Sequence, residues 1–215
     1  MKVKICGLRT VEAAQTAASA GADFLGFIFW PRSRRAIEPE AAAAICQTVK
    51  GAARVGVFVD ERPAEIQRIA RLCRLDYVQL HGHEDAAFAA SLQLPVIKAF
   101  RWGDDFSPEA ANAFPAEIIL LDSFARGMPG GTGQTFAWQQ AAAAAKQVKK
   151  PLLVAGGINQ ENVGLAQQIF QPFGVDVSGS LEENGEKSLE KIRVFMRVIR
   201  RGNEYERHTG RNSTR

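Results

Sequence analysis

The sequence has few cysteines, no long apolar run and no zinc-ligand spacing, and each absence narrows the class of protein. Three cysteines, Cys6, Cys46 and Cys73, are spread over 215 residues without a C-x-x-C pair. A sparse, odd set argues against a disulfide framework or a zinc site and favours a reducing, cytoplasmic compartment. The M-K-V-K-I-C-G start lacks an apolar run of signal-peptide length. No segment approaches the ~20 apolar residues of a membrane span, so we expect no membrane partner.

A strong surplus of one charge sign is also missing once the end of the chain is set aside. The formal net charge is +4. The last stretch alone carries five arginines against two glutamates: Arg200, Arg201, Arg207, Arg211 and Arg215 against Glu204 and Glu206. The rest is close to neutral, which gives no sign of a nucleic-acid partner. We interpret residues 1–200 as one catalytic domain and residues 201–215 as a polar, basic, flexible tail.

What the sequence does contain is a repeated pattern of a short apolar run, a turn and a helical stretch, many of them Ala-rich. Strands are expected at Val3–Ile5, Phe24–Ile28, Arg54–Val59, Tyr77–Leu80, Val96–Phe100, Ile118–Leu121, Leu152–Ala155 and Gly174–Val177. Helices are expected at Thr10–Ala20, Pro39–Val49, Pro63–Cys73, Asp85–Leu92, Ser107–Ala113, Ala137–Val148, Gln160–Phe170 and Ser188–Arg200. Short, uniformly apolar strands suit a sheet buried on both faces, and eight such units close a parallel barrel. We therefore predict a single (β/α)8 TIM barrel; an open doubly wound sheet, with its reversed strand order, is the alternative.

Glycines and serines follow the last two expected strands. Gly156 and Gly157 come after the seventh strand, and Ser178, Gly179 and Ser180 after the eighth. In such barrels these loops are the usual place for phosphate, and glycine lets main-chain N–H groups approach an anion closely. Glycines that only make turns are the plainer interpretation. Two such loops after successive strands favour a phosphate site, and therefore a small phosphorylated substrate.

Cys6 and Asp122 directly follow the first and sixth expected strands, at the end of the barrel where such enzymes carry their active sites. Most free cysteines are small buried hydrophobes, and we interpret Cys46 and Cys73, inside helices, in that way. Cys6 instead precedes a glycine at the reactive rim, where a thiolate acts as base or nucleophile. Asp122 closes the run I-I-L-L-D, where a carboxylate is costly unless it meets solvent, a partner or a ligand. Helix capping and proton donation remain equal alternatives for Asp122.

Three more residues are candidates for contact with the substrate. Asp176 lies between Val175 and Val177 and should point into the barrel mouth, where a structural hydrogen bond is the favoured interpretation. His81 follows the fourth strand, as a positioning group or a base, whereas His83 should be solvated. Arg35 belongs to a cluster of arginines near Trp30 that is either wet surface or a site for a second anionic group.

The strand-end residues together resemble the phosphoribosylanthranilate isomerases of tryptophan biosynthesis. The matching motifs, in the family's order, are K-I-C-G (4–7), G-A-D-F-L-G-F-I-F (21–29), S-R-R (33–35), V-G-V-F-V (55–59), V-Q-L-H-G (78–82), L-L-D (120–122), G-G-T-G-Q-T-F (130–136), A-G-G-I-N-x-E-N-V (155–163) and G-V-D-V-S (174–178). Each is weak alone, but the set at these spacings is specific and runs from residue 2 to about Arg200.

The resemblance implies a cofactor-independent and metal-independent Amadori rearrangement of N-(5-phosphoribosyl)anthranilate. It implies that Asp122 is the general acid that opens the sugar ring and that Cys6 is the general base that removes the proton from ribose C2. Arg35 matches the position that pairs with the anthranilate carboxylate. The phosphate would lie on Gly156, Gly157, Ser178 and Gly179. The oligomeric state stays open between monomer and homodimer.

Three departures from the family pattern stand beside this resemblance. S-G-S-L-E (178–182) replaces the usual S-S-G-V-E and touches the phosphate loop, whereas Ala137 and the stretch N-G-E-K-S (184–188) are expected to affect helix starts. The altered loop suggests a barrel that only binds a phosphorylated ligand. A different sugar-phosphate isomerase on the same scaffold is a further alternative. Retention of both Cys6 and Asp122 argues against each.

Overall fold

The protein is a closed barrel of eight parallel strands joined by helices. The computed structural model describes residues 1–103, 106–122 and 132–209, with side chains given outside 132–137 and 202–209. The strands are β1 (Lys2–Cys6), β2 (Phe24–Ile28), β3 (Ala53–Phe58), β4 (Tyr77–Leu80), β5 (Val96–Arg101), β6 (Ile118–Asp122), β7 (Leu152–Ala155) and β8 (Gly174–Val177). They pair in sequence order, and β8 closes onto β1. This order confirms the predicted barrel and rules out the open doubly wound sheet, which requires a reversal.

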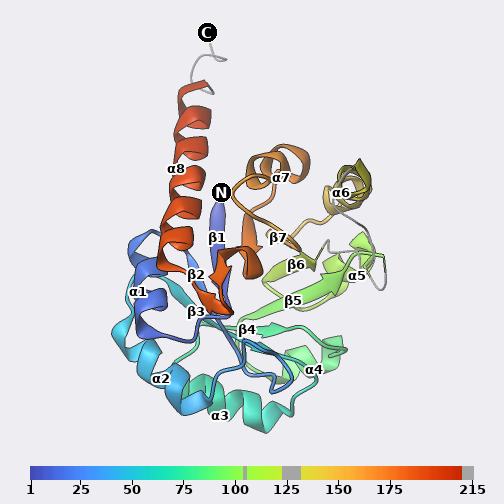
Figure 1. The fold of residues 1–215 in the computed structure, drawn as a ribbon. Helices are drawn as coiled ribbons and strands as arrows, with labels where there is room; N and C mark the ends of the chain where they lie inside the picture. Colours follow the sequence, from blue (N-terminus) through green and yellow to red (C-terminus); the bar gives the residue numbers. More distant parts are fainter. Residues whose placement is uncertain (104–105, 123–131, 210–215) are drawn as a thin grey trace.

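The helices surround the strands in Figure 1. They are α1 (Val11–Ser19), α2 (Pro39–Thr48), α3 (Pro63–Cys73), α4 (Ala86–Ser91), α5 (Pro108–Ala113), α6 (Thr132–Ala145), α7 (Val163–Phe170) and α8 (Leu189–Thr209). The expected starts are present, because Thr10 and Ser107 side chains accept from the backbone N–H groups of Ala13 and Ala110. Among the described residues, no helix is both long and apolar enough to span a membrane.

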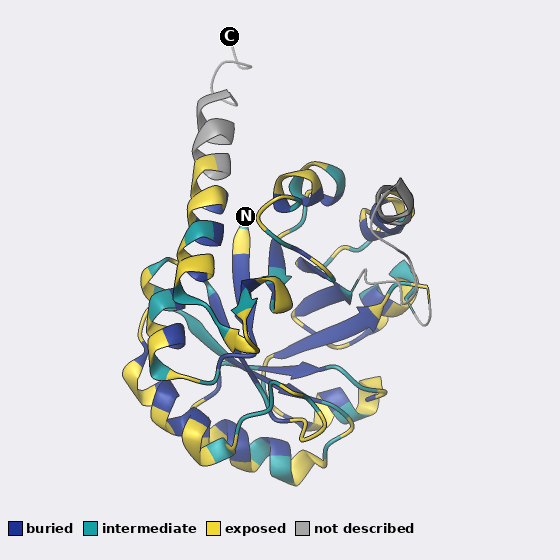
Figure 2. Ribbon diagram, in the orientation of Figure 1, coloured by how far each residue is buried: buried dark blue, intermediate teal, exposed yellow. Residues whose placement is uncertain are grey.

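Alternation along the strands divides the apolar side chains into two cores. Figure 2 shows strands that are buried almost throughout and helices with one buried and one exposed face. The larger core packs strands against helices. The smaller core fills the barrel interior with Phe24, Val55, Ile97, Ala99, Ile118, Leu120, Leu153 and Ala155. Because side chains alternate along a strand, every second residue faces the barrel interior. Toward the carboxyl ends of the strands, these inward positions are free for polar groups.

The chain between β8 and α8 contains structure that the sequence analysis did not predict. A short 3-10 helix, η1 (Gly179–Leu181), leads into an antiparallel pair, β9 (Glu182–Glu183) and β10 (Glu186–Lys187). Asn184 and Gly185 turn the pair with positive φ angles of 52° and 82°, as Asn-Gly turns commonly do. Only a changed start of the following helix was expected from N-G-E-K-S.

The last helix is longer than expected. The pattern placed its end at Arg200, but α8 continues to Thr209, so part of the proposed tail is helical. Residues 210–215 lie outside the described residues, and the flexibility of the tail stays a prediction.

Candidate active site

The main candidates from the sequence gather at one end of the barrel. Cys6 and Asp122 are the last residues of β1 and β6, while His81 and Ser178 directly follow β4 and β8. Because the strands are parallel and form one closed barrel, these positions share the rim at the carboxyl ends of the strands. The thiol of Cys6 and the carboxyl of Asp122 thus meet the first geometric requirement of the predicted chemistry.

A buried ion pair, Lys4 with Asp176, lies beneath the rim. The two residues are register partners on β1 and β8, and Lys4 Nζ lies 3.0 Å from Asp176 Oδ1. The Lys4 side chain is 0% exposed. Burial alone would lower the pKa of Lys4, but attraction to Asp176 and Cys6 outweighs burial and raises it, so the amine is an ammonium. The structural hydrogen bond expected for Asp176 is present; the sequence analysis did not single out its partner.

Cys6 is buried beside this pair. Burial raises the pKa of the Cys6 thiol, and Asp176 raises it further, whereas Lys4 and Lys187 lower it without cancelling the rise. Its main-chain carbonyl accepts a 2.9 Å hydrogen bond from Ser178 Oγ, which ties the end of β1 to the loop after β8. In the resting enzyme, the sulfur of Cys6 therefore keeps its proton to a higher pH than the sulfur of a free cysteine does. Cys46 and Cys73 are buried in α2 and α3 as expected.

His81 is a neutral ring in a charged environment. Burial lowers the pKa of His81, while the nearby carboxylates of Asp122 and Asp176 oppose that effect. Gln79 Nε2 lies 2.9 Å from His81 Nδ1; with the amide donating there, the ring proton sits on Nε2. Gln79 Oε1 is buried without a hydrogen-bond partner in the described structure. His83 is exposed, as expected.

Asp122 is half-buried at the end of β6. It is in register with Arg101 on β5 and Ala155 on β7, and its carbonyl accepts from Trp102 N at 2.9 Å. Asp122 also contributes to the charge around His81. The sequence that follows, including Gly130 and Gly131 of the family-like G-G-T-G-Q-T-F motif, lies outside the described residues.

The predicted phosphate loop after β7 has a backbone conformation that favours glycine. Gly156 and Gly157 have φ angles of +94° and +71°, which side-chain-bearing residues rarely adopt. The hydroxyls of Ser178 and Ser180 donate to the carbonyls of Cys6 and Ile158 at 2.9 and 2.6 Å. Since each hydroxyl has one proton, an anion here would have to be bound by main-chain N–H groups rather than by these side chains.

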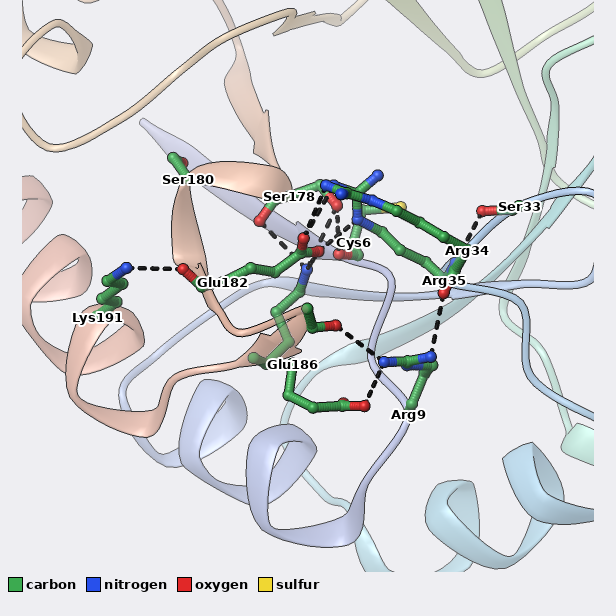
Figure 3. A network of polar contacts seen from close by, with 12 residues as sticks. Cys6, Arg9, Ser33, Arg34, Arg35, Ser178, Ser180, Glu182, Glu186 and Lys191 are labelled. Carbon is green, nitrogen blue, oxygen red and sulfur yellow. Dashed lines mark hydrogen bonds and ion pairs between the residues drawn. The ribbon is translucent and has the colours of Figure 1, made fainter.

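The guanidinium of Arg35 is already paired with a carboxylate of the protein, Glu182. The Ser33 hydroxyl accepts from Arg35 N at 3.1 Å and shapes the arginine turn. The Arg35 guanidinium makes a two-point ion pair with Glu182, through Nε and through Nη2 at 3.0 Å. Glu182 also accepts from Arg34 Nη2 at 3.1 Å and from Lys187 Nζ at 2.8 Å. Figure 3 shows Arg34 and Arg35, from the loop after β2, lying close to Glu182 of the hairpin after β8.

Arg35 also lies against the altered loop. A Cβ atom placed on Gly7 would lie 2.7 Å from Arg35 Cδ, and one on Gly179 would lie 3.0 Å from Arg35 Nη2. The arginine therefore packs between the glycine after Cys6 and the first residue of η1. The order Gly179-Ser180, which departs from the family pattern, leaves room for this approach.

Comparison with known proteins extends the agreement beyond these positions. The family model for N-(5'phosphoribosyl)anthranilate (PRA) isomerase matches residues 3–198. This chain belongs to the PRA isomerase family. The N-(5'-phosphoribosyl)anthranilate isomerase of Desulforamulus reducens is 43% identical over 201 residues, which are 93% of this chain and 95% of that protein.

Solved PRA isomerases share the fold. One is a complex with reduced 1-(o-carboxyphenylamino)-1-deoxyribulose 5-phosphate, with a TM-score of 0.79 and 33% identity over 93% of this chain and 98% of that one. Another, from Thermotoga maritima, is described as monomers generated from a dimeric enzyme; its TM-score is 0.80 and its identity 33%, over the same shares. The predicted family and fold are thus confirmed.

Sequence reasoning missed the residues that hold the candidates in place. Lys4 lies within the recognised K-I-C-G motif, and its period-2 spacing from Cys6 indicates that both face the barrel interior. Gln79 has the same relation to His81. Glu182 and Lys187 could not be identified from the sequence, because an acidic residue and a lysine on either side of a turn are typical of solvent-exposed positions. Within the described parts of the chain, no group of three or more His, Cys, Asp or Glu side chains is arranged to hold a metal ion.

Proposed function

We propose that this chain is a phosphoribosylanthranilate isomerase, acting in tryptophan biosynthesis with Cys6 as general base and Asp122 as general acid. The reaction converts N-(5'-phosphoribosyl)anthranilate to 1-(2-carboxyphenylamino)-1-deoxyribulose 5-phosphate without a cofactor. The observation that carries the proposal is the family match over residues 3–198, with a thiol and a carboxyl at the same rim. A family member in complex with the reduced form of that product supports the substrate class.

The proposed steps use two proton transfers. Asp122 gives its proton to the ring oxygen of the ribose, the C1–O bond breaks, and the ring opens to an iminium. The iminium makes the C2–H bond acidic, so the Cys6 thiolate takes that proton and becomes a thiol. The resulting enolamine tautomerises to the ketone, and proton exchange with solvent restores both groups. The net change is an isomerisation.

The remaining rim residues would bind the two anionic ends of the substrate. Main-chain N–H groups of Gly156, Gly157, Ser178 and Gly179 would hold the phosphate, and the left-handed backbone of Gly156 and Gly157 supports this for the loop after β7. Arg35 would pair with the anthranilate carboxylate. That carboxylate would have to share or replace Glu182 as its partner, since Glu182 already occupies the guanidinium.

His81 and Asp176 would contact the sugar between those ends. A neutral His81 ring, with Nδ1 accepting from Gln79, can donate one hydrogen bond to the sugar through Nε2 without repelling an iminium. Asp176, neutralised by Lys4, would accept from a hydroxyl while remaining part of the ion pair.

A barrel that only binds phosphorylated ligands, or another sugar-phosphate isomerase, would not require this thiol and carboxyl together. The decisive assay is the loss of substrate fluorescence on turnover. Cys6→Ala and Asp122→Asn should each lower kcat by at least ~10²-fold, the scale of a lost acid or base. Cys46→Ala, which removes a buried thiol from α2, is the matched control and should keep turnover. Near-normal rates in either rim variant would remove that residue from the mechanism.

We also propose a cytoplasmic location and a monomeric or homodimeric assembly, with no nucleic-acid or membrane partner. The location is supported by the sparse cysteines, and the assembly by the dimeric relative from Thermotoga maritima. Sedimentation of the purified chain would give the assembly directly; a larger oligomer would contradict it.

A further inference from the structure

Lys4 is the buried charge at the site whose purpose the acid–base steps do not explain. Its side chain is fully buried within the barrel, and a buried ammonium is costly unless it is paired. Asp176 provides that pair at 3.0 Å. Replacing a buried ion pair with apolar residues is often neutral or stabilising, so fold stability alone is a weak reason for its presence.

The geometry around Gly26 places Lys4 next to Cys6. The two side chains are two residues apart on β1 and face the same side, and Gly26 on β2 is the register partner of Cys6. A Cβ atom placed on Gly26 would lie 2.9 Å from Cys6 Sγ and 3.2 Å from Lys4 Nζ. Both polar atoms therefore approach the space that the missing side chain leaves open.

We propose that Lys4 is a positioning residue whose ammonium, held by Asp176, stabilises the thiolate of Cys6. This inference rests on the proposed function, in which Cys6 must accept a proton from carbon. Burial otherwise disfavours the thiolate, and a cation at the sulfur offsets that cost. Asp176 fixes the ammonium in place, but its own negative charge disfavours the thiolate. The pKa of Cys6 therefore depends on both members of the ion pair, which act in opposite directions.

The charges that act on Cys6 come from three elements. Lys4 lies on β1, Asp176 on β8 and Lys187 on β10, and each affects the pKa of the thiol. Lys187 is itself paired with Glu182 at 2.8 Å. Of the two cations, Lys4 lowers the pKa of the thiol more than Lys187 does. Neutralising Lys4 and neutralising Asp176 should therefore shift the pKa of Cys6 in opposite directions.

The test is the thiolate titration of Cys6 in the free enzyme, followed by ultraviolet absorbance and by the rate of iodoacetamide alkylation at Cys6. A Cys6→Ala chain provides the background from Cys46, Cys73 and the tyrosines. In Lys4→Met the titration midpoint should rise by about one pH unit or more, the usual scale for loss of a neighbouring opposite charge. Alkylation at a pH below both midpoints should then slow by about tenfold. In Asp176→Asn the midpoint should fall.

A second buried ion pair provides the matched control. Lys98 Nζ lies 2.9 Å from Glu84 Oε2, and both side chains are buried, but this pair faces outward from β5. Lys98→Met makes the same substitution in a similar environment away from the thiol. It should leave the midpoint of Cys6 unchanged even where it lowers stability.

The outcomes separate the inference from the proposed function. Opposite shifts in Lys4→Met and Asp176→Asn support it, because a merely structural role predicts no sign reversal. An unchanged midpoint in Lys4→Met, or shifts of the same sign in both variants, overturns it. If Lys4→Met does not fold, as judged by circular dichroism, Lys4→Gln takes its place in the same titration, and an unchanged midpoint in that variant overturns the inference. A wild-type chain without isomerase turnover would refute the proposed function, while the titration would still report on Lys4.

Discussion

Removing the charge of Glu182 should weaken the protein in a way that depends on pH. Its side chain is 8% exposed and accepts bonds from Arg34, Arg35 and Lys187. Burial opposes the charged carboxylate, but hydrogen bonds from Arg35 and Lys187 outweigh it and lower the pKa of Glu182 from 4.5 to about 2. One pKa unit corresponds to about 1.4 kcal/mol, so the charged form contributes roughly 3 kcal/mol to folding.

The sign of the pH dependence follows from the direction of that shift. The folded pKa is below the unfolded one, so the stabilisation is complete well above pH 4.5 and is lost as the pH falls toward 2. By pH 3, the unfolded carboxyl is protonated while the folded one is still mostly charged, and about 2 kcal/mol of the contribution is gone. The Glu182→Gln variant has no carboxylate at this position, so it does not have this pH-dependent stabilisation to lose. Its free energy of unfolding should therefore be lower than wild type near pH 7 and approach it near pH 3.

Urea unfolding followed by circular dichroism at both pH values measures this difference. Glu183→Gln is the matched control, because Glu183 is the exposed neighbour on the same short strand. Its stability should follow the wild type at each pH. The reasoning is refuted if the two variants lose equal stability near neutral pH, or if the deficit of Glu182→Gln is the same at pH 3 as at pH 7.

Two further substitutions test the phosphate loops. Gly157→Ala keeps open space around the new methyl group but forces a φ of +71° on alanine, so it should cost about 1–2 kcal/mol and raise KM more than it lowers kcat. Thermal unfolding and steady-state kinetics measure both effects; unchanged stability would contradict the backbone argument. Gly179→Ser restores a side chain usual in the family 3.0 Å from Arg35 Nη2, so the guanidinium must move and KM should change while kcat is retained. An unchanged KM would show that this approach of Arg35 is irrelevant to binding.

The sequence pattern predicted the barrel well because its signals are local. Phe24–Ile28, Tyr77–Leu80, Leu152–Ala155 and Gly174–Val177 were predicted with the same bounds that the structure shows, since each is a short apolar run between turns. Pro63–Cys73 was equally well marked, by a first-turn proline and an amphipathic face. Eight such units leave little choice of architecture.

The parts that were missed depend on contacts distant in sequence. Lys4 and Asp176 are separated by nearly the whole barrel and meet only because β8 closes onto β1. The partner of Arg35 lies in the hairpin after β8, where the sequence pattern predicts only a loop before a helix. Asn184-Gly185 is a recognised hairpin signal, but strands of two residues carry too little periodicity to support it.

The arrangement around Glu182 gives a physical reason why the rim would suit a substrate with two anionic ends. Three cationic side chains, Arg34, Arg35 and Lys187, share this one carboxylate. The one negative charge of Glu182 does not neutralise three cations, so the cluster keeps a net positive charge. The hydrogen bonds to Glu182 also hold the cationic side chains in a defined orientation. A phosphate on the neighbouring glycine loop and a carboxylate at Arg35 would supply the missing negative charge without reorganising the cations. If the substrate carboxylate shares Arg35 with Glu182 rather than replacing it, Glu182 would order the arginines before the substrate arrives, which would reduce the cost of binding.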